Sequence, residues 1–424
     1  MRAKRVILWI GVIVIILMLR TGDCSSTAKG PKSELYKQIQ LFSDAIALIN
    51  SNYVDEVEPQ KLIYGALSGM LKALDPYSQF MDPDTYNEMK VETTGKFGGL
   101  GIEISIRDNL LTIIAPINGT PAYNAGLEAG DIIVKIDGEP TRDITLIEAV
   151  KKLRGKPGSS VQLTILREEE KKLLDFKITR DIIKITSVKE SKVLDGNIGY
   201  VKLIEFQEAT SKELEKALSS LDETGVTSLI LDLRGNPGGL LNSAVEISDK
   251  FLKKGLTIVT TRGRGENQVM EFKAGNKKTA RGYPLIVLIN GGSASASEIV
   301  AGAIKDNRRG LTLGTKTFGK GSVQTVIPLA DGSALRITTA KYFTPNGTSI
   351  RNNGIEPDVV VEQKGLTVKE EPTSEEIFRH LEDKDLEESI KDDQEKEEPY
   401  DHQLATAISV MKGIVSYNEK GILR

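Results

Sequence analysis

Residues 284–298 read Pro-Leu-Ile-Val-Leu-Ile-Asn-Gly-Gly-Ser-Ala-Ser-Ala-Ser-Glu. The apolar run that opens this stretch predicts a buried strand, and the two glycines after it predict a tight turn. Residues 298–304 then have the apolar spacing of a helix. The same order occurs earlier, where the buried strand 228–233 leads into the glycine-rich turn 234–239 and another helical run. Repeated strand, turn and helix predict an α/β core whose functional groups lie at the carboxyl ends of mostly parallel strands.

A serine at such a strand-to-helix turn is a common way to present a nucleophile, and three serines compete within 293–298. The two histidines of the chain, His380 and His402, both lie in its acidic carboxyl-terminal tail. A triad of serine, histidine and aspartate is therefore not expected, and lysine is the obvious alternative base. A second interpretation of Ser295 stays open, because Ser295 and Glu298 have the spacing of a helix capping box.

The lysine that fits this role follows further along the chain. Residues 314–321 read Gly-Thr-Lys-Thr-Phe-Gly-Lys-Gly and nearly match a phosphate-binding loop. However, Gly321 stands where that loop needs Ser or Thr, and a strand follows in place of a helix, so no nucleotide site is expected. Lys320 instead lies in a glycine-bounded turn beside Gln324, although a solvated surface lysine is the ordinary alternative.

Composition describes a multidomain globular protein. A chain of 424 residues with 39% apolar residues has room for about two to four domains. The net charge of −3 gives no basic footprint for nucleic acid. The single cysteine, Cys24, excludes an internal disulfide framework and a cysteine-rich zinc site. The sequence thus indicates no cofactor and no metal.

The amino terminus predicts export. Basic residues precede an unbroken apolar run from Val6 to Leu19, which is shorter than the ~20 residues that cross a bilayer comfortably. We expect residues 1–24 to be a signal peptide, with retention as a membrane anchor as the alternative. A lipoprotein through Cys24 is disfavoured by Asp23 before it. The expected location is the extracytoplasmic side of a bacterial-type cell envelope, in the periplasm or on the outer face of the inner membrane.

Residues 32–93 predict an amino-terminal helical region. The first helix has an apolar stripe formed by Leu35, Ile39, Phe42, Ile46 and Ile49. A second helical stretch runs from about residue 61 to 74. Two helices cannot bury a core alone, so we expect them to pack on a second copy, as a homodimer, or within the monomer.

Residues 94–183 change to short β-rich runs with frequent glycine and resemble a PDZ domain. Its ligand-binding loop would consist of Gly98, Gly99, Leu100, Gly101 and Ile102, whose backbone N–H groups converge on a terminal carboxylate, while the following strand pairs with the ligand backbone. A glycine-rich hairpin without a ligand is the alternative. The ligand should end in a free carboxylate with small or apolar final residues.

The carboxyl-terminal part divides in two. Residues 366–400 are acidic and low in apolar content, which predicts a solvated linker. A helix is expected over 401–415, with Leu404 and Ala407 on its apolar face. We expect this helix to dock on the amino-terminal helices or on a second subunit.

Taken together, residues 32–365 resemble the carboxyl-terminal processing (tail-specific) serine proteases. The matching motifs are Leu229–Arg234 with its glycine turn, the Ser-Ala-Ser-Ala-Ser-Glu element, and Thr317–Gly321 with Gln324. The resemblance implies an α/β multidomain protein: the helical segment, the PDZ domain, a layered, crotonase-like protease core over 184–365, and the carboxyl-terminal helix.

The resemblance also implies roles for single residues. Ser295 would be the nucleophile, Lys320 its general base, and Gln324 the residue that holds the lysine amine. The backbone N–H groups of Gly239 and Ala296 would form the oxyanion hole. Supporting roles would fall to Glu298 and Asp306.

The implied function is a serine endopeptidase that binds substrate tails through its PDZ domain and cleaves through an acyl-enzyme. Its partners would be protein substrates with free, small or apolar C-termini, together with an adaptor protein. Two other classes stay open: a non-catalytic PDZ peptide-binding envelope protein, and an acyl-transfer enzyme on a similar core.

Overall fold

The structure is a computed structural model that describes residues 31–107, 110–167, 172–265, 268–275, 281–363 and 400–419. The predicted export segment and nearly all of the acidic linker lie outside the described residues. The chain divides into two compact units, with the boundary between Leu74 and Asp75. In the described ranges, no helix has both the length and the apolar character needed to cross a membrane.

The first unit contains the two predicted helices, α2 (Pro31–Asn52) and α3 (Pro59–Lys72). Pro59 stands in the first turn of α3, where its missing N–H is not needed and its fixed φ suits the helix. The apolar stripe of α2 is largely exposed: Leu35 is 61% exposed and Ile39 is 52% exposed. Within the first unit, α3 therefore leaves most of this stripe uncovered.

The second unit begins with a short strand and a helix that fall largely within the predicted helical region 32–93, although neither was predicted as a separate element. Strand β1 (Gln79–Met81) pairs with β18 (Ala334–Phe343), and α4 (Pro83–Thr94) follows. Asp82 caps α4 by accepting a hydrogen bond from Thr85 N at 2.8 Å, and Gly95 ends the helix with φ +65°. These end signals are present in the sequence, but α4 has no buried residue and lacks a clear apolar stripe.

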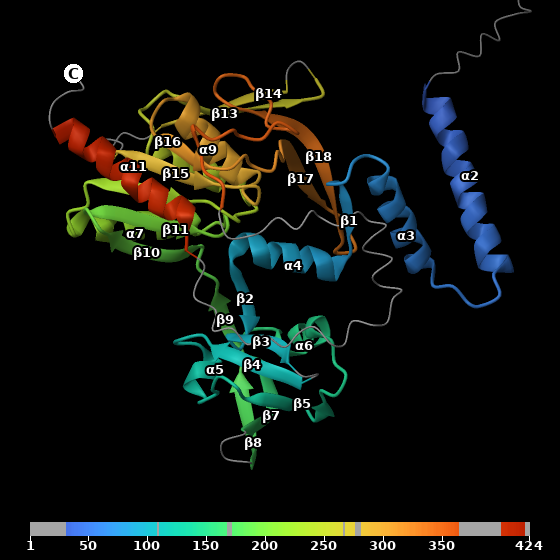
Figure 1. Cartoon of the computed structure of the whole chain (residues 1–424). Helices are drawn as coiled ribbons and strands as arrows, with labels where there is room; N and C mark the ends of the chain where they lie inside the picture. Colours follow the sequence, from blue (N-terminus) through green and yellow to red (C-terminus); the bar gives the residue numbers. More distant parts are fainter. Residues whose placement is uncertain are drawn as a thin grey trace, which may run out of the picture. The chain divides into compact units, whose positions relative to one another are not determined.

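A six-stranded antiparallel sheet forms the region predicted to be a PDZ domain (Figure 1). Its strands are β3 (Ile102–Arg107), β4 (Leu110–Pro116), β5 (Ile132–Ile136), β6 (Glu139–Pro140), β7 (Ser160–Arg167) and β8 (Lys172–Thr179). Helices α5 (Pro121–Asn124) and α6 (Leu146–Leu153) complete it. Its apolar core includes Ile113, Ile133 and Leu163. The chain enters and leaves through a separate strand pair, β2 (Lys96–Gly99) and β9 (Asp181–Lys184).

The core predicted to carry the chemistry is built on a second six-stranded sheet in the order β10-β11-β12-β15-β16-β19. Apart from the antiparallel edge strand β10, neighbouring strands are parallel, as the strand and helix alternation predicts. The strands are β10 (Val188–Leu194), β11 (Ile198–Leu203), β12 (Ser228–Asp232), β15 (Leu285–Ile289), β16 (Leu311–Gly314) and β19 (Val359–Val360).

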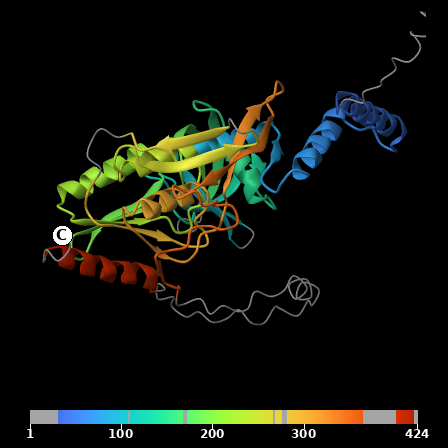
Figure 2. The ribbon, with the colours of Figure 1, turned by 90° about the horizontal axis from the view of Figure 1, so that it is seen from above.

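Helices cover both faces of this sheet. Alternate strand residues point to opposite sides, and apolar residues on both sides need to be buried. Leu229, Leu231 and Val287 face α7 (Thr210–Glu223), α8 (Leu241–Asp249) and α9 (Ala296–Asp306). Ile230 and Ile286 face the other side, where α11 (His402–Glu419) packs. Figure 2 shows α11, in red, on one side of the sheet and α7 and α9 on the other. The result is a three-layer α/β core.

The position of α11 corrects one expectation. Ala407 and Met411 are fully buried, and they pack in one cluster with sheet residues of the same chain. The apolar face of α11 is therefore covered by the central sheet, and not by the amino-terminal helices or a second subunit. The helix also runs to residue 419, beyond the predicted end at 415.

A further sheet completes the second unit. Long antiparallel strands β17 (Ser322–Pro328) and β18 form a hairpin, and β18 also pairs with β13 (Thr257–Gly263), which pairs with β14 (Val269–Lys273). Strand β17 starts directly after the Lys320 turn. The sheet therefore links Lys320 to β1 and to the residues that precede it.

Candidate active site

Ser295 lies at the junction between β15 and α9, as the sequence predicts. It is the N-cap of α9, is 8% exposed, and has φ +52° and ψ −110°. A non-glycine residue with positive φ outside the left-handed helical region is strained, and such strain persists where the surroundings impose it. The turn therefore holds this serine in a conformation that an isolated chain would avoid.

Hydrogen bonding separates the three competing serines. The Ser293 hydroxyl donates to Leu233 O at 2.8 Å, and the Ser297 hydroxyl donates to Asn236 O at 2.9 Å. Both side chains are fully buried. The Ser295 hydroxyl, in contrast, donates to no group in the described part of the chain. Ser293 and Ser297 tie the two glycine turns together, which leaves Ser295 as the serine with a free proton.

The turn after β12 lies directly against Ser295. A Cβ placed on Gly238 would lie 2.8 Å from Ser295 Cβ and 2.9 Å from Ala296 N. Gly238 and Gly239 have φ of +103° and +142°, values that side chains rarely tolerate. The Gly238 carbonyl accepts a hydrogen bond from Phe206 N at 2.9 Å. Within the described ranges, the N–H groups of Gly239 and Ala296 have no acceptor, so two free donors flank Ser295.

Glu298 joins the Ser295 turn to the Lys320 turn. Its carboxylate is fully buried and accepts from Ser295 N at 2.8 Å, and the predicted capping box between Ser295 and Glu298 is present. The same oxygen accepts from Lys320 N at 2.9 Å. Its other oxygen accepts from Thr317 Oγ1 and Gly319 N, at 2.6 and 2.7 Å. Burial raises the pKa of Glu298, whereas these four donors favour the charged form.

Lys320 is partly withdrawn from water. Burial lowers the pKa of its amine, the nearby Arg336 lowers it further, and Glu298 opposes the shift. The amine lies 5.6 Å from the ring centre of Tyr77, within the range of a cation–π interaction. Tyr77 is held by Asp75, which accepts hydrogen bonds from the backbone of Tyr77 and of Ser78. Tyr77 lies just beyond the second predicted helical stretch, which ends at about residue 74, and its contact with Lys320 was not predicted.

Two predicted contacts are not formed, and Asp306, which was expected to have a supporting role, lies away from Ser295. The Ser295 hydroxyl and the Lys320 amine do not hydrogen-bond to each other in this structure. The Gln324 amide nitrogen donates to Ser322 Oγ at 2.8 Å, and no hydrogen bond joins Gln324 to Lys320. Asp306 lies at the far end of α9, about 16 Å along the helix from Ser295. There it accepts from Asn346 N at 3.0 Å, so it stabilises a neighbouring turn.

The predicted PDZ ligand loop is also open to a ligand. Gly99, Leu100, Gly101 and Ile102 line a cavity of about 90 Å³, together with Phe97, Ile104, Val150, Leu153 and Arg154. The carbonyls of Leu100 and Gly101 accept hydrogen bonds from Ala122 N and Ile117 N, whereas their own N–H groups have no acceptor in the described chain. Strand β3, which follows, is at an edge of its sheet.

Gly98 differs from the other residues of that predicted loop. It belongs to β2, which pairs with β9, and a Cβ there would lie 2.0 Å from Gly155 O. Gly98 is therefore a close-packing position and does not line the cavity.

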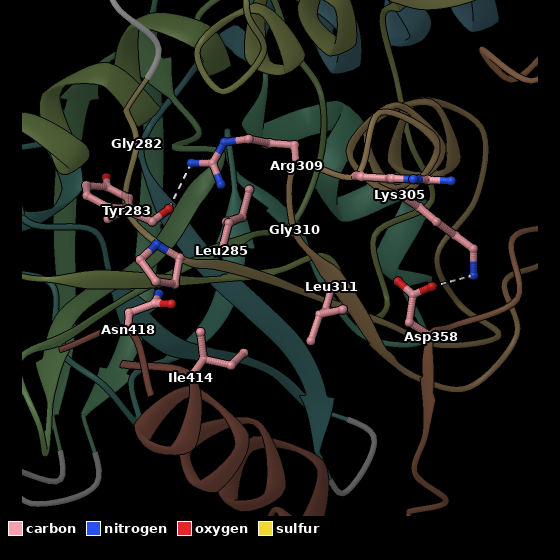
Figure 3. A pocket seen from close by; sticks show the side chains of 12 residues that line it. Gly282, Tyr283, Leu285, Lys305, Arg309, Gly310, Leu311, Asp358, Ile414 and Asn418 are labelled. Carbon is pink, nitrogen blue, oxygen red and sulfur yellow. Dashed lines mark hydrogen bonds and ion pairs between the residues drawn. The ribbon is translucent and has the colours of Figure 1, made fainter. Parts of the chain in front are cut away.

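A larger cavity, of about 540 Å³, contains none of the predicted catalytic residues (Figure 3). It lies where β15 and β16 begin, at the opposite end of these strands from the Ser295 turn. Figure 3 shows the two contacts that hold its wall: Arg309 donates to Tyr283 O at 2.9 Å, and Lys305 pairs with Asp358 at 2.9 Å. Because Arg309 also donates to Phe251 O, its guanidinium serves to satisfy backbone carbonyls.

Family models match three parts of the chain. Residues 197–361 match peptidase family S41, residues 112–167 match a PDZ domain, and residues 19–85 match the N-terminal domain of the activating protease CtpB.

Two curated relatives agree with these matches. A carboxy-terminal-processing protease of Bartonella bacilliformis is 50% identical over 332 residues, which is 77% of this chain and 76% of that protein. The carboxy-terminal processing protease CtpB of Bacillus subtilis is 39% identical, over 81% of this chain and 72% of that protein. The photosystem II D1 C-terminal processing protease aligns structurally over 76% of this chain and 92% of that chain, with 31% identity and a TM-score of 0.43.

Proposed function

Because this chain belongs to peptidase family S41, the PDZ-containing carboxy-terminal processing serine proteases, we propose that it cleaves proteins through a dyad of Ser295 and Lys320. The observation that carries this proposal is the state of Ser295. Its hydroxyl proton is uncommitted, its backbone is strained, and two unpaired N–H groups flank it. That combination offers a nucleophile and an oxyanion hole at one point.

The chemistry begins with proton transfer. Lys320 in its neutral form takes the Ser295 proton while Oγ bonds to the carbonyl carbon of the substrate. The N–H groups of Gly239 and Ala296 then stabilise the oxyanion. Lys320 returns the proton to the leaving amine as the C–N bond breaks, which leaves an ester on Ser295. Water attacks this ester, gives its proton to Lys320 and releases the new C-terminus, and Ser295 regains its proton.

This cycle needs a neutral lysine near pH 7. A lysine in water has a pKa of about 10.4, so a fall of about 3 units, equivalent to roughly 4 kcal/mol, is required. Burial lowers the pKa of Lys320, which is the direction that this cycle needs. The bound substrate would exclude more water and lower it further.

Lys320 must also turn from Tyr77 toward Ser295. The lysine backbone is fixed by Glu298, so rotation of the flexible side chain is the motion required. We propose that Gln324 then holds the amine. Its nitrogen already donates to Ser322, and this bond leaves its carbonyl oxygen as the acceptor for Lys320.

Substrate tails would enter through the PDZ domain. The free N–H groups of Leu100 and Gly101 suit a terminal carboxylate, and edge strand β3 suits the backbone of the tail. A cavity of about 90 Å³ suits small or apolar final side chains. The guanidinium of Arg154 stacks 4.5 Å from the Phe97 ring centre at this cavity. Arg154 would couple binding of the tail to the protease core.

We extend the proposal to partners and location. The exposed apolar stripe of α2 suits a second copy of the chain, which supports a homodimer through the amino-terminal helices. The basic and apolar amino terminus supports a place in the cell envelope, exported or anchored by that segment. An adaptor protein would deliver substrates there.

The test compares full-length protein with the Ser295→Ala variant on an unfolded substrate that ends in apolar residues. Cleavage by the parent alone is the expected result. Binding of the tail by both proteins without cleavage would instead establish a non-catalytic PDZ protein. Hydrolysis of acyl thioesters without cleavage of peptides would establish an acyl-transfer enzyme.

A further inference from the structure

Arg234 stands at the carboxyl end of β12, at the start of the turn that ends in Gly238 and Gly239. Its side chain is 8% exposed, and all of its N–H donors have acceptors. Nε and Nη2 donate to the two oxygens of Asp232 at 3.0 and 2.7 Å. Nη1 and Nη2 donate to the two oxygens of Asp401, both at 2.7 Å, and Nη1 also donates to Gln403 Oε1 at 3.1 Å. Two carboxylates therefore hold one guanidinium in a fixed plane.

The second carboxylate comes from the far end of the chain. Asp401 directly precedes α11, and it also accepts a hydrogen bond from Leu404 N at 2.9 Å at the start of that helix. Gln403, which is 1% exposed, donates to Val361 O at 2.8 Å. The start of α11 is thus bonded to Arg234 and to the segment after β19.

The same guanidinium is bonded to the turn that carries the proposed oxyanion donor. Asp232 is fully buried and accepts from Arg234 N at 2.9 Å as well as from Tyr200 Oη at 2.8 Å. The next residue, Gly235, donates to Asn290 Oδ1 at 2.9 Å, in the turn that leads to Ser295. Asp401 is therefore connected to both glycine turns, by its hydrogen bonds to Arg234, by the backbone from Arg234 to Gly235, and by the hydrogen bond from Gly235 to Asn290.

We propose that Asp401 is a positioning residue for the oxyanion hole, so that the carboxyl-terminal helix α11 is required for catalysis through its bond to Arg234. This inference rests on the proposed function of Gly239 and Ala296. Removal of the Asp401 charge leaves Arg234 buried with one carboxylate, and a guanidinium in that position moves toward water or toward other acceptors. The turn that begins at Arg234 moves with it.

An alternative is that Asp401 only helps α11 to pack. The chain offers a matched control for this possibility, because α11 has a second ion pair, between Lys412 and Asp195. These two side chains are 46% and 86% exposed, and Lys412 lies about three turns along α11 from Asp401. Loss of this pair weakens the attachment of α11 without touching Arg234.

The experiment compares full-length Asp401→Asn and Lys412→Ala with the parent chain. We expect kcat for a short peptide to fall at least tenfold in Asp401→Asn, with KM changed less than twofold, because the oxyanion contact is made in the transition state. A peptide boronate, which forms a tetrahedral adduct with an active serine, should lose affinity by a similar factor. Lys412→Ala should change none of these values more than twofold, and Asp401→Glu should recover part of the loss.

Hydrogen exchange provides a readout that does not depend on proteolysis. Amides in residues 233–240 should exchange at least tenfold faster in Asp401→Asn and at the parent rate in Lys412→Ala. If the parent neither cleaves peptides nor binds the boronate, the proposed function fails while the exchange difference stands. Equal effects of Asp401→Asn and Lys412→Ala, or parent-like kcat and exchange in Asp401→Asn, would overturn the positioning role. Should Asp401→Asn unfold, Gln403→Ala removes one acceptor of Arg234 and should give a smaller change of the same kind.

Discussion

The turn at Gly239 and the loop at Gly101 present the same kind of group in different ways. In both, carbonyl oxygens are bonded within the fold while adjacent N–H groups have no acceptor in the described chain. The PDZ loop continues into an open edge strand, which suits a stable ligand. The Gly239 turn is instead packed against Ser295 and fixed by buried side chains. Backbone N–H groups can thus serve binding or catalysis, and the difference lies in what faces them.

The largest expected effect concerns the nucleophile itself. Ser295→Ala removes the group that forms the acyl-enzyme, so kcat/KM should fall by about 10⁴-fold or more. Affinity for a peptide with a free C-terminus, measured by fluorescence anisotropy, should stay unchanged because the PDZ loop is untouched. Equal loss of tail binding would show that the two sites are not separate.

The next effect tests the catalytic turn. In Gly239→Ala, the new Cβ would lie 2.2 Å from Phe206 O at a φ of +142°, so the turn must shift and its N–H must turn away. Loss of one oxyanion donor costs about 10²–10³-fold in kcat. We expect that loss in steady-state kinetics, with tail affinity unchanged. A parent-like kcat would remove Gly239 from the oxyanion hole.

The corresponding change in the PDZ loop should have the opposite pattern. In Gly101→Ala, the Cβ would lie 2.3 Å from Thr120 Cβ at a φ of +78°, which displaces the loop. We expect tail affinity to fall about tenfold or more, which is about 1.4 kcal/mol. Turnover of a short peptide that does not reach the PDZ domain should stay within twofold. An amidated tail should reproduce the loss in the parent chain.

The smallest effect concerns pH. Activity needs neutral Lys320, so kcat/KM should rise with pH through the pKa of this lysine, which burial lowers. The charged groups around the amine are Arg336, which lowers that pKa, and Glu298, which opposes it, while the Tyr77 ring favours the ammonium form.

Tyr77→Leu should therefore lower the pKa and move the rise in kcat/KM to lower pH by about half a unit. Tyr77→Phe keeps the ring face and should keep the parent profile. A shift to higher pH in Tyr77→Leu would contradict the cation–π contact.

The sequence predicted the local features better than the contacts between distant segments. The strand, turn and helix around Ser295 follow from apolar periodicity and glycine, and the structure confirms them. The contacts of Tyr77 with Lys320, and of Arg234 with Asp401, join segments that are far apart in the chain. Periodicity carries no information about such pairs. The helix α4 was not predicted as a separate element of the helical region 32–93 for another reason: its capping residues are clear, but it buries no apolar face.

Because periodicity does not report contacts between distant segments, the surface that covers the carboxyl-terminal helix and the position of Asp306 were not predicted either. The apolar face of α11 was visible in the sequence, but the surface that covers it was not. Asp306 was assigned by resemblance alone, and a helix of this length separates it from Ser295. The sequence offered Glu298 as a helix cap. In the structure its carboxylate accepts hydrogen bonds from the backbone of both turns of the site, because the Lys320 turn lies against the start of α9.

The proposed chemistry depends most directly on Ser295 as a nucleophile that Lys320 activates. We would treat the full-length protein with a fluorophosphonate, and compare it with Lys320→Met by peptide mass mapping over time. We expect one adduct, on Ser295, that forms at least about 10²-fold more slowly in Lys320→Met, since a general base contributes that much. An adduct on Ser293 or Ser297, or labelling of Ser295 at the same rate in both proteins, would contradict it.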